Sequence, residues 1–303
     1  MNRRTSAWRT QLRMTAWLTV VLTLAAGMIA SPSYAATWPP TDWLVKGQDL
    51  QPWNPGGNYP DIGMAAAASD NNLTLPSFTW TLCGSWNGTV YGKSDYTPCT
   101  SKPGSTLVVE NYDELKAAIA DGLFTQLHMQ YAMYDLESWV LTPPAQAANP
   151  PYWIKQAVTL ANQNGIKLIV TTGGRTNTVA NDEAAVADNA YMVAVQSQSW
   201  GWDKTTASWS LDTFDARVRY AVRAMRATRT DDHTDTLIML GLGTNTWRVH
   251  PVSLLQSEFS IIRALSVSDV WLNANNWQAN DQCTAADGGY GCPLIGAQFL
   301  SAP

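Results

Sequence analysis

The feature that most restricts the fold is a regular alternation of apolar and amphipathic segments, which begins at Ser105 and continues to Asn273. Residues 106–109 form an apolar run of strand length. Asn111 then precedes a helical pattern with acids in its first turn, a combination that favours a helix start. Residues 212–227 carry apolar side chains at helical spacing along one face. Strands that alternate with helices of this length predict βαβ units and a parallel sheet.

Eight segments qualify as strands of such a sheet. They are residues 62–68, 77–82, 106–109, 127–134, 166–171, 191–198, 237–240 and 270–273. No convincing helix separates the first two. We therefore predict an α/β fold, a (β/α)8 TIM-like barrel that is irregular in its first two units, with an open doubly wound sheet as the alternative. The glycine runs do not indicate a nucleotide site, because Gly241-Leu242-Gly243 lacks the third Gly of the dinucleotide fingerprint and Gly173-Gly174 lacks the phosphate-loop Lys.

The first 35 residues have the pattern of a signal peptide. Four arginines precede an uncharged apolar run at residues 14–30, and Ser33-Tyr34-Ala35 offers a small-x-small cleavage site. Arg3-Arg4 does not continue as a twin-arginine motif, so ordinary secretion is favoured. An uncleaved anchor is the alternative, because the apolar run is near the lower length limit for a membrane span. We predict a signal peptide at 1–35, an extended Trp- and Pro-rich arm at 36–60, and a barrel domain at 61–303.

Composition narrows the possible partners. Cleavage after Ala35 would remove four of the 19 basic residues and none of the 24 acidic residues, leaving a net charge of −9. Such a surface argues against nucleic acid and against anionic membranes. We expect a secreted, extracellular monomer that binds a neutral ligand, with no membrane contact after cleavage and no cofactor.

The chain has four cysteines, an even count that suggests two disulfides in an exported protein. Three pairings are possible. We favour the local pairs Cys83–Cys99 and Cys283–Cys292, since each would close a Gly-rich loop. No metal site is predicted, because the chain has no Cys-x-x-Cys and its three histidines are scattered.

The candidate chemistry lies at the end of the fourth predicted strand. Asp135 and Glu137 share one face of this strand with Tyr131 and Met133, because strand side chains alternate. Two carboxyls on one face tend to raise each other's pKa, which keeps one of them protonated as a proton donor. The alternative is that both acids are simply solvated where the strand ends.

The carboxyl ends of the other predicted strands test this idea, since catalytic groups of such barrels gather there. These ends supply Arg175, Gln196, Gln198, Asn245, Trp271 and Asn273. Amides can bind hydroxyls with donor and acceptor together, and indole rings offer apolar faces. Each Trp could instead be a core residue. Of the 15 Trp of the chain, 13 follow the predicted signal peptide, many of them in predicted loops, and this excess favours a site for a carbohydrate substrate or ligand.

The strand-end Asp135-x-Glu137, with Trp271 on the eighth strand, resembles the barrel family of chitinases and endo-N-acetylglucosaminidases, and also the barrel-type lysozymes. This resemblance implies that Glu137 is the general acid/base and that Asp135 helps the substrate's own N-acetyl group act as nucleophile. The chain departs from the family twice. Met133 replaces an Asp of the motif, and Gln196 and Gln198 occupy the stretch of a Tyr-Asp pair. The run from Tyr134 to Trp139 also resembles a set of secreted bacterial proteins.

We predict a secreted glycoside hydrolase that acts on an extracellular or cell-wall polysaccharide. Asp135 and Glu137 would carry the chemistry, while Trp271 forms the floor of the site. The residues expected to bind the sugar are Gln196, Gln198, Asn245, Trp271, Asn273, Tyr131 and Arg175. The alternative is a catalytically inactive glycan-binding barrel, which the two departures favour. A structural envelope protein would require the arm at 36–60 to bind a partner.

Overall fold

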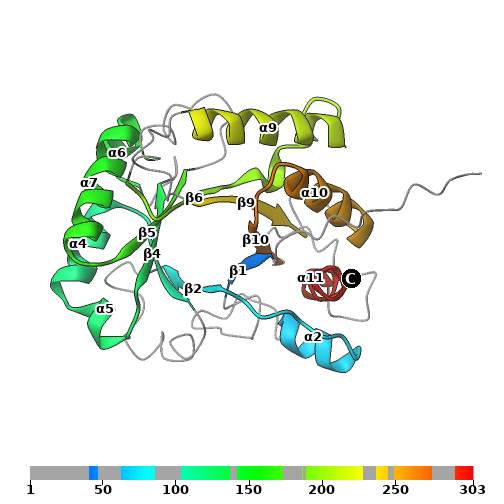
Figure 1. Cartoon of the computed structure of the whole chain (residues 1–303), viewed down its shortest axis with the longest axis horizontal. Coiled ribbons are helices and arrows are strands. Elements are labelled where there is room, and N and C mark those ends of the chain that lie inside the picture. The colour runs from blue at the N-terminus through cyan, green and yellow to red at the C-terminus, as the bar shows by residue number, and fades with distance from the viewer. Residues whose placement is uncertain are drawn as a thin grey trace, which may run out of the picture. The chain divides into compact units, whose positions relative to one another are not determined.

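Eight parallel strands close into a barrel in the part of the chain that the structure describes (Figure 1). The structure is a computed structural model, and it describes residues 41–46, 63–85, 104–136, 142–172, 186, 189–227, 237–244, 249–274 and 291–302. The barrel strands are β1 (Asp42–Lys46), β2 (Trp80–Ser85), β3 (Ser105–Val109), β4 (Tyr131–Leu136), β5 (Lys167–Thr172), β6 (Met192–Val195), β9 (Leu237–Gly243) and β10 (Asp269–Asn273). Since β1 pairs with both β2 and β10, the sheet has no edge. The predicted (β/α)8 barrel is confirmed, and the alternative open sheet is wrong.

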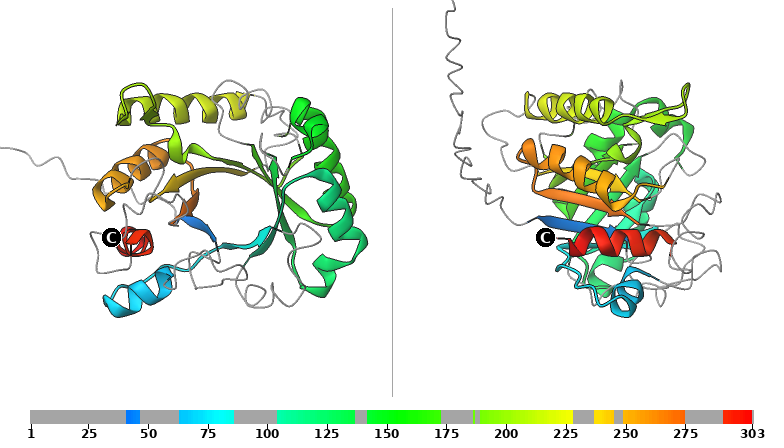
Figure 2. Two further views of the ribbon diagram at one scale, coloured as in Figure 1. Left: turned by 180° about the vertical axis from the view of Figure 1, so that it is seen from behind. Right: turned by 90° about the vertical axis from the view of Figure 1, so that its right-hand side faces the viewer.

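Helices cover the outside of this barrel, as the views in Figures 1 and 2 show. They are α2 (Met64–Asp70), α4 (Tyr112–Ala120), α5 (Leu123–Gln126), α6 (Pro144–Ala148), α7 (Pro150–Gln163), α9 (Leu211–Ala227), α10 (Val252–Ala264) and α11 (Gly291–Ser301). A short 3₁₀ turn, η2 (Ser197–Ser199), follows β6. A separate antiparallel pair, β7 (Trp202–Asp203) and β8 (Ser208–Trp209), precedes α9. Within the described ranges, no helix combines the length and the apolar character needed to cross a membrane.

Local sequence explains where α4 begins. The Asn111 side chain accepts a hydrogen bond from the backbone N–H of Glu114, and its amide donates to Glu114 Oε1 at 2.8 Å. The other carboxylate oxygen of Glu114 accepts from the backbone N–H of Glu110 at 2.8 Å. These bonds satisfy backbone donors that a helix start leaves open. The predicted cap at Asn111 is confirmed.

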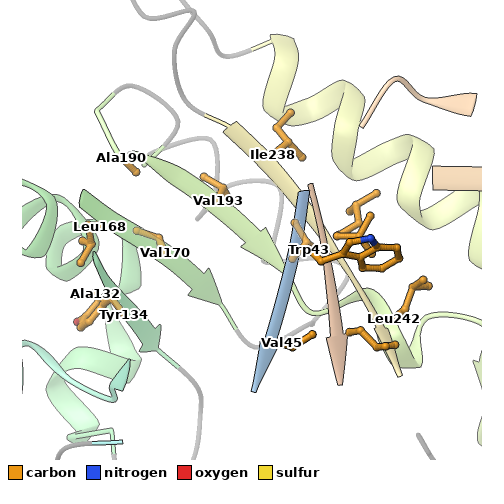
Figure 3. Packing of buried hydrophobic residues seen from close by; sticks show 14 of the residues in the cluster. Trp43, Val45, Ala132, Tyr134, Leu168, Val170, Ala190, Val193, Ile238 and Leu242 are labelled. Carbon is orange, nitrogen blue, oxygen red and sulfur yellow. The ribbon is translucent and has the colours of Figure 1, made fainter. Parts of the chain in front are cut away.

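Strand alternation divides the core into an inner and an outer part. Leu44, Met133 and Met239 belong to the cluster inside the barrel. Their strand neighbours point outward to the helices, as Ala132 and Tyr134 of β4 do in Figure 3. Every second residue of a barrel strand therefore faces the barrel interior. The predicted buried face of α9, which includes Phe214, Val218, Ala221, Val222 and Met225, is confirmed.

The first barrel unit differs from the prediction. Residues 62–68 were expected to form a strand, but Met64–Asp70 is a helix that buries Met64, Ala67 and Ala68. Their spacing is helical, and alanine is the best helix former, so the short apolar run was misread. The true first strand is Asp42–Lys46, inside the predicted arm at 36–60. The barrel therefore begins before residue 61.

Three further boundaries differ. The fourth strand was predicted from residue 127, but Leu123–Gln126 is a helix and His128 has a φ of +53°, so β4 begins only at Tyr131. β6 ends at Val195, and Gln196 and Gln198 belong to the η2 turn region and not to a strand. The helix α11 was not predicted, because its residues follow an expected cysteine-closed loop. It packs against α2, and Gly296 permits this approach, since a Cβ there would lie 2.8 Å from Met64 Sδ.

Candidate functional site

The candidate site is built around Asp135, at the carboxyl end of β4. Met133 lies in the inner core, so alternation places Asp135 on the face of β4 that points into the barrel. The barrel register pairs Asp135 with Thr171 of β5. Gln196, which follows β6, donates from Nε2 to Asp135 Oδ1 at 3.2 Å. The structure thus brings together two of the predicted site residues, Asp135 and Gln196.

The η2 turn supplies a second glutamine to the same end of the barrel. Ser197 Oγ donates to the backbone oxygen of Gly241 on β9 at 2.7 Å, which fastens the turn to the neighbouring strand. A Cβ on Gly241 would lie 2.5 Å from Gln198 Oε1. The missing side chain of Gly241 therefore leaves the space that the Gln198 amide occupies.

Asn273 completes this layer from the last strand. Asp135 lies on β4, Asn273 lies on β10, and Gln196 directly follows β6. These three strands alternate around the barrel, as the strands that supply one interior layer do. Three oxygens at this end are buried and have no hydrogen-bond partner among the described residues: Thr171 Oγ1, Gln198 Oε1 and Asn273 Oδ1. Buried polar atoms normally have partners. Buried oxygens that lack a partner among the described residues, at the carboxyl end of a barrel, are therefore available to accept hydrogen bonds from a ligand.

Two predicted binding residues occupy other places in the barrel. Trp271 is 4% exposed and belongs to the inner core, two residues before Asn273 on the same face of β10. Tyr131 is the first residue of β4, four residues before Asp135, so about 13 Å of strand separates them. Its ring lies 5.5 Å from that of Tyr191, with Lys167 Nζ over both rings. Tyr131 thus lies at the amino end of the barrel, away from Asp135.

Several predictions concern residues outside the described part of the chain. These are Glu137, Arg175, Asn245, Cys99 and Cys283. Of the predicted disulfide residues, Cys83 and Cys292 are buried, and no described cysteine is free. The pairing stays a prediction, since both proposed partners are among the residues outside. In the described part of the chain, no three His, Cys, Asp or Glu side chains gather in a way that could hold a metal ion.

Sequence reasoning missed one carboxyl at this end of the barrel. Glu110 directly follows β3 and is 4% exposed. Val108 faces the inner core, so alternation turns Glu110 to the same interior. The signal was available, because Glu110 stands between a correctly predicted strand and a correctly predicted cap. Burial, helped by the nearby Glu110 charge, raises the pKa of Glu114 to about 7 although two hydrogen bonds to its carboxylate oppose this.

His250 lies near the end of β9 in a buried contact. Its Nδ1 is 3.5 Å from Glu258 Oε1 on α10, and both side chains are at most 1% exposed. The Trp209 ring lies 4.3 Å from the imidazole, and the backbone N–H of His250 donates to Thr244 O. These contacts join α10 and the β7–β8 pair to the end of β9, which is a structural role.

Comparison with known proteins supports the fold. No family model matches the chain, and no curated protein sequence does. The spore cortex-lytic enzyme SleL of Bacillus megaterium QM B1551 is similar in structure, with a TM-score of 0.53 and 9% identity over 88% of this chain and 75% of that one. The catalytic domain of a family GH18 chitinase from the fern Peteris ryukyuensis has a TM-score of 0.50 and 10% identity over 86% of this chain and all of that one. The chain therefore has the barrel fold of the TIM-barrel glycosidases.

Proposed function

We propose that the protein is a secreted glycoside hydrolase that acts on an extracellular or cell-wall polysaccharide. The observation that carries this proposal is the set of polar groups at the carboxyl end of the barrel. Asp135 accepts a hydrogen bond from Gln196, and at the same end lie oxygens of Thr171, Gln198 and Asn273 that have no hydrogen-bond partner within the described ranges. A ligand rich in hydroxyl donors would satisfy them.

In this proposal Glu137 is the general acid/base. It would protonate the glycosidic oxygen while the substrate's own N-acetyl group attacks the anomeric carbon and the leaving sugar departs. It would later remove a proton from the water that opens this intermediate. Asp135, two residues earlier in the sequence, is the positioning partner. Its bond to Gln196 Nε2 fixes the carboxylate before substrate arrives. Fixed polar groups cost no reorganisation in the transition state, which is how such a site lowers a barrier.

A catalytically inactive glycan-binding barrel is the second candidate, and a specific observation favours it. The motif of the resembling family has an Asp where this chain has Met133, and Met133 is packed in the inner core. Gln196 and Gln198 also replace a Tyr-Asp pair. A barrel that keeps its amides without these acids can bind a sugar without cleaving it.

Incubation of the mature protein with a panel of glycans and purified cell walls tests the two candidates. Released sugars are measured by mass spectrometry for the wild type, for Glu137→Gln and for Asp121→Asn, a control that removes an exposed carboxylate at the end of α4. We expect release by the wild type and the control and none by Glu137→Gln. Retention on one glycan without release by any variant supports the binding barrel. Equal release by Glu137→Gln contradicts the acid/base role.

Secretion, a monomeric state and the disulfides Cys83–Cys99 and Cys283–Cys292 are part of the proposal. Expression of the full chain with its first 35 residues, followed by N-terminal sequencing of the protein in the medium, tests cleavage after Ala35. Peptide mapping under non-reducing conditions tests the two pairings. Linked peptides that join Cys83 to Cys283 would contradict them.

A further inference from the structure

We propose that Glu110 is a further ligand-binding carboxylate of the candidate site, coupled to Asp135 across β3 and β4. The proposal rests on the proposed function for the nature of the ligand, but the coupling itself does not depend on hydrolysis. It assigns a role to a buried acid that the acid/base scheme does not use.

The barrel register brings the two carboxyls together. Val109 of β3 pairs with Tyr134 of β4, so the residues that follow, Glu110 and Asp135, come opposite each other. Val109 and Tyr134 both belong to the outer core, which turns the two acids inward. Neighbouring strands lie about 4.8 Å apart, so both side chains reach the same space. Glu110 is 4% exposed, so its carboxyl is shielded from water.

The backbone of Glu110 is fixed from two sides. Its N–H donates to Glu114 Oε2 at 2.8 Å, and its carbonyl oxygen accepts from Thr142 Oγ1 at 3.2 Å. These two bonds fix the backbone of Glu110 and therefore the direction of its Cα–Cβ bond. Groups that bind a ligand from a fixed backbone lose little entropy on binding.

A buried oxygen beside the pair points to a ligand. Thr171 is fully buried, is opposite Asp135 in the register, and has no hydrogen-bond partner for Oγ1 among the described residues. Asp135 and Thr171 thus lie opposite each other on β4 and β5, and Glu110 extends this row from the end of β3. With Gln198 Oε1 and Asn273 Oδ1, the row offers mainly acceptors. The ligand must therefore bring donors, as the hydroxyl groups of a sugar ring do.

The test begins with the protein's own titration. The carboxyl carbons of Glu110 and Asp135 are followed by ¹³C NMR in the wild-type mature chain as the pH is changed. Coupled groups titrate in shared steps, so both curves should show the same two midpoints. The other described acids near the pair are Asp113 and Glu114 on α4, and their resonances are followed in the same spectra. Independent single-step curves for Glu110 and Asp135 would overturn the coupling.

Two variants then measure the size of the coupling between Glu110 and Asp135. Glu110→Gln removes one of two like charges, so the Asp135 midpoint should fall by about one pH unit or more. Asp113→Asn removes the same charge from an exposed position on α4 and should move that midpoint far less. Circular dichroism and thermal unfolding establish that each variant folds. A folded Glu110→Gln with an unmoved Asp135 midpoint would refute the proposal.

Ligand binding is measured on the glycan that the panel selects. Loss of a charged acceptor should weaken binding about tenfold to a hundredfold in Glu110→Gln and leave Asp113→Asn unchanged. Unchanged affinity in a folded Glu110→Gln contradicts the ligand contact. If the wild type hydrolyses no glycan while the two carboxyls titrate together, the proposed hydrolase fails and the Glu110–Asp135 coupling stands. If the wild type hydrolyses a glycan while Glu110 and Asp135 titrate independently, the proposed hydrolase stands and the Glu110–Asp135 coupling fails.

Discussion

Replacement of Thr171 by Val should make the protein more stable and its ligand binding weaker. Thr171 is fully buried on β5, and its hydroxyl has no hydrogen-bond partner among the described residues. A buried hydroxyl without a partner costs about 1–3 kcal/mol of stability in proteins. Val has the same shape without the hydroxyl, so Thr171→Val should raise the free energy of unfolding by about that amount. The Tm should then rise by about 2–4 °C for each kcal/mol.

Thr106→Val is the matched control. Thr106 is equally buried on β3, but its Oγ1 donates to Gly104 O at 2.7 Å. The same substitution there removes a satisfied bond and should lower stability by about 1 kcal/mol. Denaturant unfolding of both variants, beside the wild type, measures the difference.

The functional half of this prediction uses the glycan panel. If the Thr171 hydroxyl serves a ligand, Thr171→Val should bind that ligand about three- to tenfold more weakly while it unfolds at higher temperature. Such a trade of stability for function is common at binding sites. A loss of stability in Thr171→Val, similar to that in Thr106→Val, would refute the reasoning, because it would mean that the hydroxyl is already satisfied in the free protein.

Two further predictions concern other buried groups. Burial, helped by the charge of Asp42, raises the pKa of Asp269 from 3.8 to about 6. The contribution of the protonated Asp269 to stability is therefore greatest below pH 4 and is lost as the pH rises through 6. The Asp269→Asn variant should be as stable as the wild type in acid and more stable at pH 7, by up to about 3 kcal/mol. A difference in stability that stays constant across this pH range would contradict the raised pKa of Asp269. Gly241→Ala should displace the Gln198 amide and weaken ligand binding, since the new Cβ would meet Gln198 Oε1. In a Gln198→Ala background the same change should have little further effect, and additive losses in that cycle would show that the two residues do not act together.

Local patterns in the sequence predicted those parts of the fold that depend on neighbouring residues. The apolar face of α9 and the cap at Asn111 follow from spacing within one helix, and both are confirmed. The alternation of strands and helices was enough to predict the parallel barrel and seven of its eight strands. The first unit failed because Met64–Asp70 is short and alanine-rich, while β1 lies among Trp and Pro residues that have no period.

The candidate site was predicted only in part, for a similar reason. Asp135 and Gln196 stand at strand ends, and strand ends meet in a parallel barrel. The roles of Thr171 and Gly241 depend on register between strands that are far apart in the chain, and on where β6 gives way to a 3₁₀ turn. No pattern of neighbouring residues in the sequence predicts the strand register or the point where β6 ends. Tyr131 was placed in the site because strand parity gives the face of a residue but not its height along the barrel.

The pairing of β1 with β10 determines how the barrel can form. Asp42 is opposite Asp269, so the contact that seals the ring joins residues from nearly opposite ends of the sequence. Contacts of such long range are slow to form, because a large loop must close before they gain anything. We expect the seal to be a late event in folding. A fragment that began at residue 61 would lack the strand β1. Its strands β2 and β10 would then be edge strands with unpaired backbone groups, which can pair with another molecule and lead to aggregation.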